Sequence, residues 1–310
     1  MAKNGKTVLV TGANGMLATN IVEQLALAGY HVIGTVRKGR KYRGEGADNV
    51  TVAEADFKDR SAMEPLVAGC DIVFHVAAMT SQSEKDYNVF RQVNVESTKM
   101  LLDLAVAANV GTFVYVSTAN TIGYGGDENA AMKYPFTESF YALSKKEAED
   151  AALSYSGKLR VVVVNPTFMI GKYGSEKGSN RIFSMVRKSP VVFCPSGGKN
   201  VLDVSEAARG MILAMEKAPT GSRYLITGYN YHYKDLFRKI AGEFHVKRLY
   251  ISLPDWLLRL AGRAGDLLAR CGVASEVSTT NMSMLLAENF YNTDKACREI
   301  GFMARDLFGK

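Results

Sequence analysis

The sequence is poor in the residues that build cross-linked or metal-stapled scaffolds. Its 310 residues include only four cysteines and four histidines. No two of them have the short paired spacing of a disulfide framework, a zinc site or an H-x-x-x-H motif, so metal catalysis has no support and a reducing cytoplasm fits. These residues are Cys70, Cys194, Cys271 and Cys297, and His31, His75, His232 and His245.

Long apolar runs are missing as well. The densest run is the four valines Val161 to Val164, and Asn165-Pro166 ends it. A membrane-spanning helix needs about 20 apolar residues, so none is predicted. Residues 1–6 lead straight into the first apolar run with no signal-peptide core, and we therefore expect a cytoplasmic protein.

Charge of one sign is only slightly in excess. Lysine and arginine number 38 and aspartate and glutamate 31, which leaves +7 spread along the chain. This excess fits a solvated basic surface or a preference for anionic ligands, and net charge alone does not decide between them. Nucleic-acid binding is not expected, because no aromatic-plus-basic platform is present.

Short β-rich runs alternate with longer helical patterns through the N-terminal half. The predicted strands are Thr7–Thr11, His31–Val36, Val50–Glu54, Ile72–His75, Thr112–Ser117 and Arg160–Asn165. The predicted helices between them are Leu17–Ala28, Ser61–Ala68, Val89–Ala108 and Tyr141–Ser156. Ser61 to Glu64 predicts a capping box, and Gly29 a helix C-terminus. Such an alternation predicts a parallel sheet covered by helices on both faces.

A glycine-rich turn follows the first predicted strand and opens the first helix. Glycine permits the tight turn and lets backbone N–H groups approach an anion at the helix N-terminus. The strand–turn–helix context predicts a site for the pyrophosphate of a dinucleotide and a Rossmann doubly wound α/β fold. The segment is Gly12-Ala13-Asn14-Gly15-Met16-Leu17, followed by Ala18.

The strand–helix rhythm fades after Pro166, where glycines and charges cluster and mixed patterns follow. We predict a dinucleotide-binding domain over residues 1–165, to which residues 200–226 return. Residues 166–310 are predicted to form mostly a smaller, mixed substrate-binding lobe. Its predicted elements are strands at Val191–Phe193 and Tyr224–Thr227 and helices at Val204–Lys217, Tyr233–Phe244 and Pro254–Cys271.

The spacing T-G-x-x-G-x-x-A resembles the extended short-chain dehydrogenase/reductase family, which belongs to the NAD-dependent epimerase/dehydratase superfamily. Several other segments match the pattern of that family. The resemblance implies that Asp56-Phe57 contacts adenine, that the backbone of Val76-Ala77-Ala78 after His75 lines the cofactor, that Asn94 belongs to the site, and that Pro166-Thr167 after Asn165 passes the nicotinamide.

The residues after the second predicted strand bear on the choice of cofactor. An NAD site usually has an acidic residue there to bond the ribose 2′-hydroxyl. This chain instead has Arg37 and Lys38, followed by Arg40 and Lys41. A guanidinium can grip a 2′-phosphate, so NADP(H) is favoured, with NAD(H) as the alternative.

Tyr141 and Lys145 form a Y-x-x-x-K motif that places a phenol and an ammonium on one face of a helix. The ammonium is expected to lower the tyrosine pKa so that the phenol exchanges protons near neutral pH. Thr118 ends the preceding strand, and the resemblance to the family implies that it hydrogen-bonds the substrate oxygen, with Ser117 as the runner-up. Two further pairs have the same spacing but lie in a loop and in the tail: Tyr173 with Lys177, and Tyr291 with Lys295.

The second half gives a weaker indication of the substrate. Relatives that act on sugar nucleotides carry an arginine where Asn200 stands here, and the segment Val162–Gly171 looks more like the dihydroflavonol reductase and 3β-hydroxysteroid dehydrogenase branch. We therefore expect a small, apolar carbonyl or alcohol substrate. Lys172 and Arg181 leave an anionic substrate open.

Residues 253–272 predict an amphipathic helix, with apolar side chains on one face and a charged stripe opposite. We expect the apolar face to pack in the core or in a pocket wall. Contact with a membrane surface is the alternative. The apolar residues are Trp256, Leu257, Leu260, Ala264, Leu267 and Leu268, and the charged ones are Arg259, Arg263, Asp266 and Arg270.

These features predict an NADP(H)-dependent oxidoreductase that reduces a ketone or aldehyde, or oxidises the alcohol. The first alternative is a sugar-nucleotide epimerase or dehydratase that uses the same three residues. The second alternative is a dinucleotide-sensing regulator that does no chemistry. A homodimer remains open.

Overall fold

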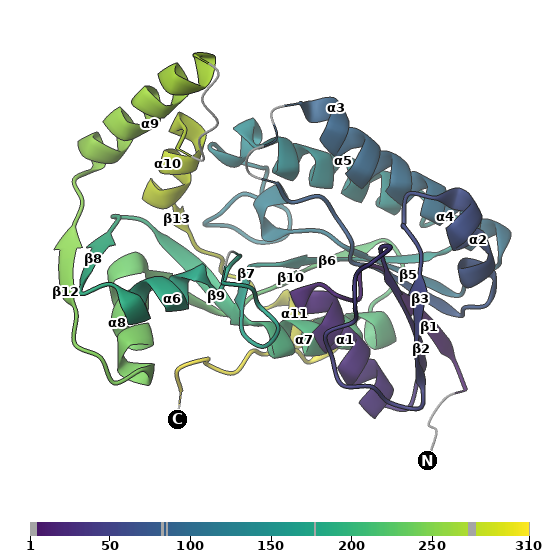
Figure 1. Ribbon diagram of the computed structural model, residues 1–310. Helices are drawn as coiled ribbons and strands as arrows, with labels where there is room; N and C mark the ends of the chain where they lie inside the picture. Colours follow the sequence, from purple (N-terminus) through teal and green to yellow (C-terminus); the bar gives the residue numbers. More distant parts are fainter. Residues whose placement is uncertain (1–4, 82–83, 85, 177, 272–276, 310) are drawn as a thin grey trace.

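Seven parallel strands form the central sheet of the computed structural model, which describes residues 5–81, 84, 86–176, 178–271 and 277–309 (Figure 1). The strand order is β3-β2-β1-β4-β5-β6-β10. The order reverses between β1 and β4, and ligands of doubly wound sheets bind at the carboxyl ends of the strands beside such a reversal. The strands are β1 Thr7–Val10, β2 His31–Val36, β3 Val50–Glu54, β4 Ile72–His75, β5 Thr112–Val116, β6 Arg160–Pro166 and β10 Ser222–Ile226.

Helices cover both faces of this sheet because successive strand residues point to opposite sides. Val8 and Val10 are buried with α1 and α7, whereas Leu9 between them is buried with α2 and α4. Both apolar layers are fully closed, which confirms the predicted doubly wound fold. The helices are α1 Met16–Leu27, α7 Val204–Lys217 and α11 Lys295–Ile300 on one face, and α2 Arg60–Ala68, α4 Ser97–Ala107 and α5 Phe140–Ser154 on the other.

Two local predictions in this half are wrong. The α2 helix has no capping box at Ser61, because Asp59 is the N-cap and accepts hydrogen bonds from the backbone of Ser61 and Ala62. The predicted helix 89–108 is divided into α3 (Tyr87–Phe90), a π-helical segment η1 (Arg91–Glu96) and α4. Gly29 follows α1 with a φ of 87°, as expected of a glycine at a helix C-terminus.

The rest of the chain builds the smaller lobe, which lies beside the carboxyl edge of the sheet (Figure 1). Strand β9 pairs with β11, β13 and β7, and a separate ribbon joins β8 to β12. Within 200–226, the end of β9 belongs to this lobe, while α7 and β10 join the central sheet. The elements are β7 Phe168–Ile170, α6 Arg181–Lys188, β8 Val191–Cys194, β9 Gly198–Asp203, β11 Tyr229–His232, α8 Tyr233–Glu243, β12 Leu249–Ser252, α9 Asp255–Arg270, α10 Thr279–Leu286 and β13 Glu288–Asn289.

The expectation that the apolar face of α9 packs in the core is wrong. Leu258, Gly262 and Gly265 are the buried residues of α9. Gly262 lies so close to α10 that an added Cβ would be 2.8 Å from the Cα of Thr279. Because this narrow strip of small residues makes the contact, the large apolar side chains of α9 stay at the surface. Gly272, the last residue of the predicted segment, lies outside the described residues.

In the part of the chain that the structure describes, no helix has both the length and the apolar character required to cross a membrane.

Candidate active site

The glycine turn between β1 and α1 forms one end of the candidate site. Gly12 has a φ of 70°, and a Cβ there would lie 3.0 Å from the Cβ of Ala77. Gly15 is the N-cap of α1, and no side chain caps this helix. The first backbone N–H groups of α1 therefore have no capping side chain, and a helix start of this kind attracts phosphate.

A buried histidine joins this turn to the segment after β4. The Thr11 hydroxyl lies 3.0 Å from Nδ1 of His75 and accepts hydrogen bonds from the backbone N–H groups of Val76 and Ala77. Nε2 of His75 lies 3.0 Å from the Thr98 hydroxyl. Burial and the nearby Lys145 lower the pKa of His75 to about 3, so the ring is neutral at physiological pH. His75 therefore fixes the loop that faces Gly12.

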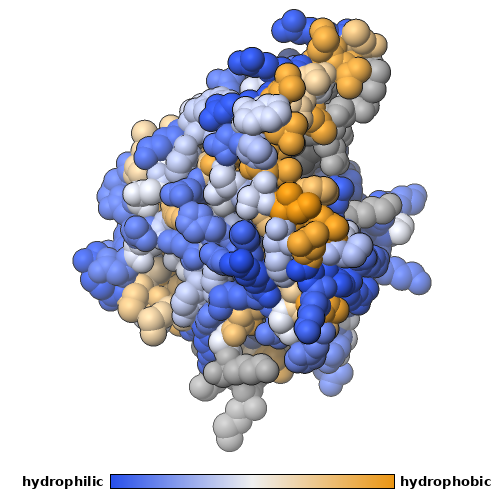
Figure 2. All heavy atoms as spheres, turned by 90° about the vertical axis from the view of Figure 1, so that its left-hand side faces the viewer, coloured by the Kyte–Doolittle hydropathy of each residue, from blue (hydrophilic) through white to orange (hydrophobic). Residues whose placement is uncertain are grey.

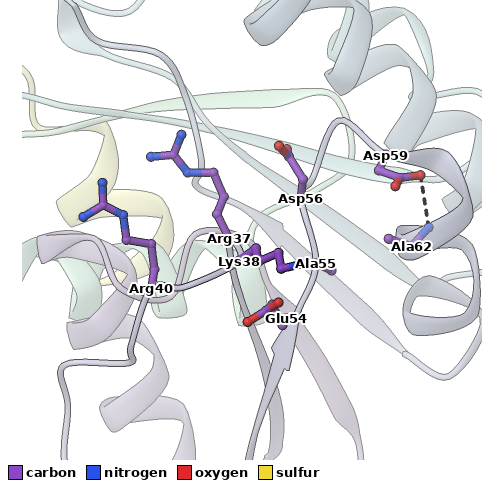
Figure 3. Close-up of a pocket in the computed structure, with 8 residues that line it drawn as sticks. All are labelled: Arg37, Lys38, Arg40, Glu54, Ala55, Asp56, Asp59 and Ala62. Carbon is purple, nitrogen blue, oxygen red and sulfur yellow. Dashed lines mark hydrogen bonds between the residues drawn. The ribbon is translucent and has the colours of Figure 1, made fainter.

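A cavity of about 510 Å³ lies beyond the turn, at the ends of β2 and β3 (Figure 3). Arg37, Lys38 and Arg40 line it, which brings together three of the four cations that the sequence singled out, and Lys41 does not line it. Asp56 lines it too, as does Glu54, which sequence reasoning missed. Oε2 of Glu54 accepts a hydrogen bond from the backbone N–H of Gly39 at 3.3 Å. A carboxylate is thus present in the cavity, but it comes from the end of β3 rather than β2.

The other predicted cofactor residues divide into those at the surface of the turn and those in the core. Asn14, Met16, Val76 and Ala78 are half-buried beside the turn. Ala13 and Leu17 are buried in the core, so only their backbone can face a ligand. The Phe57 ring is also in the core, 5.7 Å from the His75 ring, and Asp56 alone of that pair reaches the cavity.

Tyr141 lies in the first turn of α5, which Ser139 caps by accepting a hydrogen bond from the backbone of Ala142. Thr118 follows β5, and its hydroxyl lies near the Tyr141 phenol, where it favours a lower pKa of that phenol. Burial raises the pKa of Tyr141 to about 12, and the nearby Thr118 hydroxyl offsets only part of that rise. The expectation that Lys145 lowers this pKa is wrong for this structure, and the phenol is protonated at neutral pH.

Lys145 lies one turn further along α5 and is buried. Its Nζ donates a hydrogen bond to the Val116 carbonyl at 2.7 Å and lies 4.2 Å from the centre of the Tyr115 ring. Burial lowers the pKa of Lys145 to about 7, and the charge of Glu149 works in the opposite direction. Lys145 therefore changes its charge near physiological pH, which no spacing argument could show.

Glu149 is the residue of this region that sequence reasoning missed. It is fully buried and pairs with Arg223 at 2.7 Å. Its Oε2 accepts hydrogen bonds from the Ser117 hydroxyl at 2.6 Å and from the Asn165 amide at 2.8 Å. Since Ser117 is committed to this carboxylate, Thr118 is the hydroxyl that remains for a substrate oxygen. Its position in the sequence could have pointed to it, because Glu149 lies four residues after Lys145 and therefore on the same helix face.

The remaining predicted residues support the site by hydrogen bonding. Asn94 is buried, and its amide bonds both the backbone of Met79 and the Ser144 hydroxyl, which ties η1 to the loop after β4 and to α5. Pro166 ends β6, and the Thr167 hydroxyl donates to the Asn200 side chain at 2.7 Å. Asn94 and Thr167 therefore hold segments together rather than presenting free groups.

The two rival tyrosines lie in different surroundings. The Tyr173 hydroxyl donates to Glu23 on α1 at 2.5 Å, and its partner in the motif, Lys177, lies outside the described residues. Tyr291 is buried, and its hydroxyl donates to the Ala119 carbonyl at 2.8 Å. Neither tyrosine lies in a helix, whereas Tyr141 does.

The cation of strand β9 is Lys199, the neighbour of the Asn200 that sequence reasoning emphasised. Asn200 is buried and bonds Thr167 and Asn230. Nζ of Lys199 lies 4.3 Å from the centre of the Phe168 ring, and burial lowers its pKa to about 8. Strand β9 therefore still carries a cation at Lys199, although Asn200 stands where relatives that act on sugar nucleotides have an arginine.

Comparison with known proteins bears on these features. The profile of the NAD dependent epimerase/dehydratase family matches residues 8–227, which include the glycine turn, the cation-lined cavity and the Tyr141–Lys145 helix. The chain belongs to this family. The predicted resemblance to extended short-chain dehydrogenases/reductases is thereby confirmed, together with an oxidoreductase that acts on carbonyl and hydroxyl groups and a nicotinamide dinucleotide as cofactor.

Individual relatives cover nearly the whole chain. A Synechocystis protein whose name assigns it provisionally to dihydroflavonol 4-reductase is 28% identical over 94% of this chain and 88% of its own. A Stigmatella aurantiaca 4-hydroxy-2-methyl-3-oxo-4-farnesyl-3,4-dihydroquinoline-1-oxide ketoreductase is 27% identical over 96% and 91%. The crystal structure of gox2253 has a TM-score of 0.83 and 26% identity over 98% of this chain and 94% of its own.

Proposed function

We propose that this family member is an NADP(H)-dependent reductase of a ketone or aldehyde on a small, apolar substrate. The observation that carries the proposal is the placement of Thr118 beside Tyr141 at the carboxyl end of β5, with Lys145 one turn away on α5. This arrangement supplies two hydroxyl groups where a parallel sheet binds its ligands. The reverse oxidation would use the same residues.

The cofactor would lie across the switch point of the sheet. The uncapped N-terminus of α1 and the close approach of Gly12 to Ala77 suit a pyrophosphate. Arg37 and Arg40 suit the adenosine end, where Lys38 and Asp56 also line the cavity. When bound, the reduced nicotinamide supplies the hydride.

The chain's own residues would handle the substrate oxygen. Thr118 orients the carbonyl oxygen by a hydrogen bond, and Tyr141, which stays protonated because its pKa is about 12, donates its proton as the carbonyl carbon receives hydride. Lys145 in its charged form stabilises the phenolate that results, and Glu149 favours that charged form. Holding the reacting groups in register is the protein's main contribution.

The cofactor preference gives a direct prediction. NADPH should bind at least about tenfold tighter than NADH, a difference of about 1.4 kcal/mol, because the Arg37 guanidinium can pair with the 2′-phosphate. Arg37→Ala should remove most of that difference, as measured by fluorescence or calorimetric titration of both cofactors. Arg43→Ala, an exposed arginine that does not line the cavity, is the control. Equal affinities of the unmodified protein for the two cofactors would refute the preference.

Two observations bear on the substrate class. The relatives named above include a ketoreductase of a farnesylated quinoline, which supports an apolar carbonyl compound for this chain. Lys199 beside Phe168 supports the second candidate, a sugar-nucleotide epimerase or dehydratase, because a cation on this strand could pair with a diphosphate. We favour the reductase because Asn200, the neighbour of Lys199 on β9, already bonds Thr167 and Asn230 and has no free group for a diphosphate.

Net consumption of the cofactor separates the two candidates. A panel of apolar ketones and aldehydes should consume NADPH in a one-to-one ratio with alcohol formed, because a reductase releases oxidised cofactor. UDP- and dTDP-sugars should neither raise the melting temperature nor isomerise. If a sugar nucleotide stabilised the protein and no carbonyl compound did so, the second candidate would replace the first.

A further inference from the structure

Helix α9 exposes a stripe of large apolar side chains along its length. Trp256 is 65% exposed, Leu260 56% and Leu267 62%, and Leu257 and Leu268 beside them are exposed as well. These residues recur at helical spacing and therefore share one face. The helix makes its contact with α10 through a different face, so nothing in the described part of the chain covers the stripe.

The apolar surface continues from α9 onto the neighbouring ribbon. Phe193 on β8 and Ile251 on β12 are directly paired, and both are exposed. Leu249, two residues before Ile251, is 61% exposed. Figure 2 faces this side of the molecule and shows hydrophobic residues gathered along it, over α9 and the ribbon below. We call these eight side chains the α9 patch. A contiguous exposed apolar patch of this kind marks an interaction surface.

Three arginines border the α9 patch. Arg259, Arg263 and Arg270 were expected opposite the apolar face, but at about 3.6 residues per turn they lie along one edge of it, and all three are exposed. Within the described residues, none of them forms an ion pair. The two acidic side chains of α9 are already engaged, since Asp255 accepts a hydrogen bond from Ser196 and Asp266 accepts one from the backbone of Thr279. These bonds come from neutral donors and leave both carboxylate charges in place, so the three arginines and two aspartates of α9 give the helix a net charge of +1.

We propose that the α9 patch docks on an anionic lipid surface. Trp256 and the leucines would enter the boundary between headgroups and acyl chains, while the arginines would bond lipid phosphates. An amphipathic helix with apolar, aromatic and cationic side chains of this kind lies in the plane of a membrane rather than across it. Charge complementarity favours lipid over a second copy of this chain, because two copies would bring their arginine stripes together.

Trp256, the only tryptophan of the chain, makes the proposal directly measurable. Its emission in buffer should be that of a water-exposed indole, because the side chain is 65% exposed. Vesicles of phosphatidylcholine with phosphatidylserine should shift the emission to the blue and co-sediment with the protein. Vesicles of phosphatidylcholine alone should do so much less. Binding should weaken as salt rises, since screening shortens the Debye length from ~10 Å at 0.1 M to ~3 Å at 1 M.

A matched pair of variants tests the apolar part of the surface. Leu260→Asp should lower the vesicle partition coefficient about tenfold or more, because it removes buried apolar area and adds a charge that anionic lipid repels. Leu27→Asp, which changes an 87% exposed leucine at the end of α1, should leave partitioning unchanged. Both variants should keep the thermal stability of the unmodified protein, because both side chains are already in water.

Three results would overturn the proposal. The first is no sedimentation with anionic vesicles and no spectral shift. The second is a Leu260→Asp variant that partitions as the unmodified protein does. The third is blue-shifted Trp256 emission without vesicles, accompanied by a concentration-dependent mass in analytical ultracentrifugation. That result would show a second copy of the chain covering the α9 patch.

Discussion

Replacing Tyr141 by phenylalanine is expected to lower kcat by about 10²–10⁴-fold, the range for loss of a positioned general acid. The change removes one phenolic oxygen and leaves the ring, so folding and cofactor affinity should persist. The phenol lies beside Thr118, and its pKa of about 12 keeps the proton available for transfer throughout the neutral range. Steady-state turnover of a carbonyl substrate, measured beside NADPH affinity and the melting temperature, checks the prediction.

The other two Tyr/Lys pairs provide the controls. Tyr173→Phe removes a hydroxyl that bonds Glu23 on α1, and Tyr291→Phe removes one that bonds the Ala119 carbonyl. Both variants should stay within a few-fold of normal turnover, although Tyr291→Phe will lose some stability because that bond is buried. Near-normal turnover in Tyr141→Phe together with a large loss in Tyr173→Phe would place the active site in the loop after β7 instead.

The sheet could be predicted because its signals are local. Strands β2, β3 and β4 begin and end at the predicted residues, since each is a short apolar run between turn residues. The predicted helix boundaries differ from the observed ones where more than one residue could cap a helix or where the helical geometry changes. Asp59 outcompeted Ser61 as the cap of α2 because its carboxylate reaches two backbone N–H groups. The π-helical segment η1 interrupts a pattern that was amphipathic throughout, and periodicity does not report such an interruption.

The residues of the candidate site could be predicted where they belong to a motif. They could not be predicted where tertiary packing determines which side chains meet and how deeply they are buried. The pairing of Thr118 with Tyr141 follows from strand and helix positions that the sequence contains. By contrast, the carboxylate of Glu54 enters the cation-lined cavity from β3, and the pKa of Lys145 falls because of burial. The prediction that the apolar face of α9 is buried was wrong for the same reason, because packing decides which face makes the contact. A helical wheel separates the apolar face from the charged face, but it cannot show that a third face of small residues makes the contact.

The buried pair of Glu149 and Arg223 gives the second large prediction. Glu149→Gln should lower the free energy of unfolding by about 3 kcal/mol, because breaking a buried ion pair costs ~3–5 kcal/mol and Arg223 keeps some contact with solvent. Ser117, Thr121 and Asn165 all donate to Oε2, which the amide oxygen can replace. The amide nitrogen then stands in place of Oε1, where it cannot accept the hydrogen bond from Arg223. Urea unfolding at pH 7 measures the loss.

Glu147→Gln is the matched control, two residues earlier on α5. Glu147 pairs with Arg91 at the surface, where such a pair contributes about 0–1 kcal/mol, so this variant should remain close to the unmodified protein. A loss in Glu149→Gln no larger than in Glu147→Gln would show that the buried carboxylate contributes little to stability.

Glu149→Gln should also change the pH dependence of turnover. The negative charge of Glu149 raises the pKa of Lys145 against the larger effect of burial, so its removal lowers that pKa further below about 7. If reduction uses the charged form of Lys145, the alkaline decline of kcat moves to lower pH in Glu149→Gln and stays in place in Glu147→Gln. An unchanged profile in Glu149→Gln would mean that the carboxylate holds Ser117, Thr121 and Asn165 in place without acting on the lysine, and a structural role alone would then account for its burial.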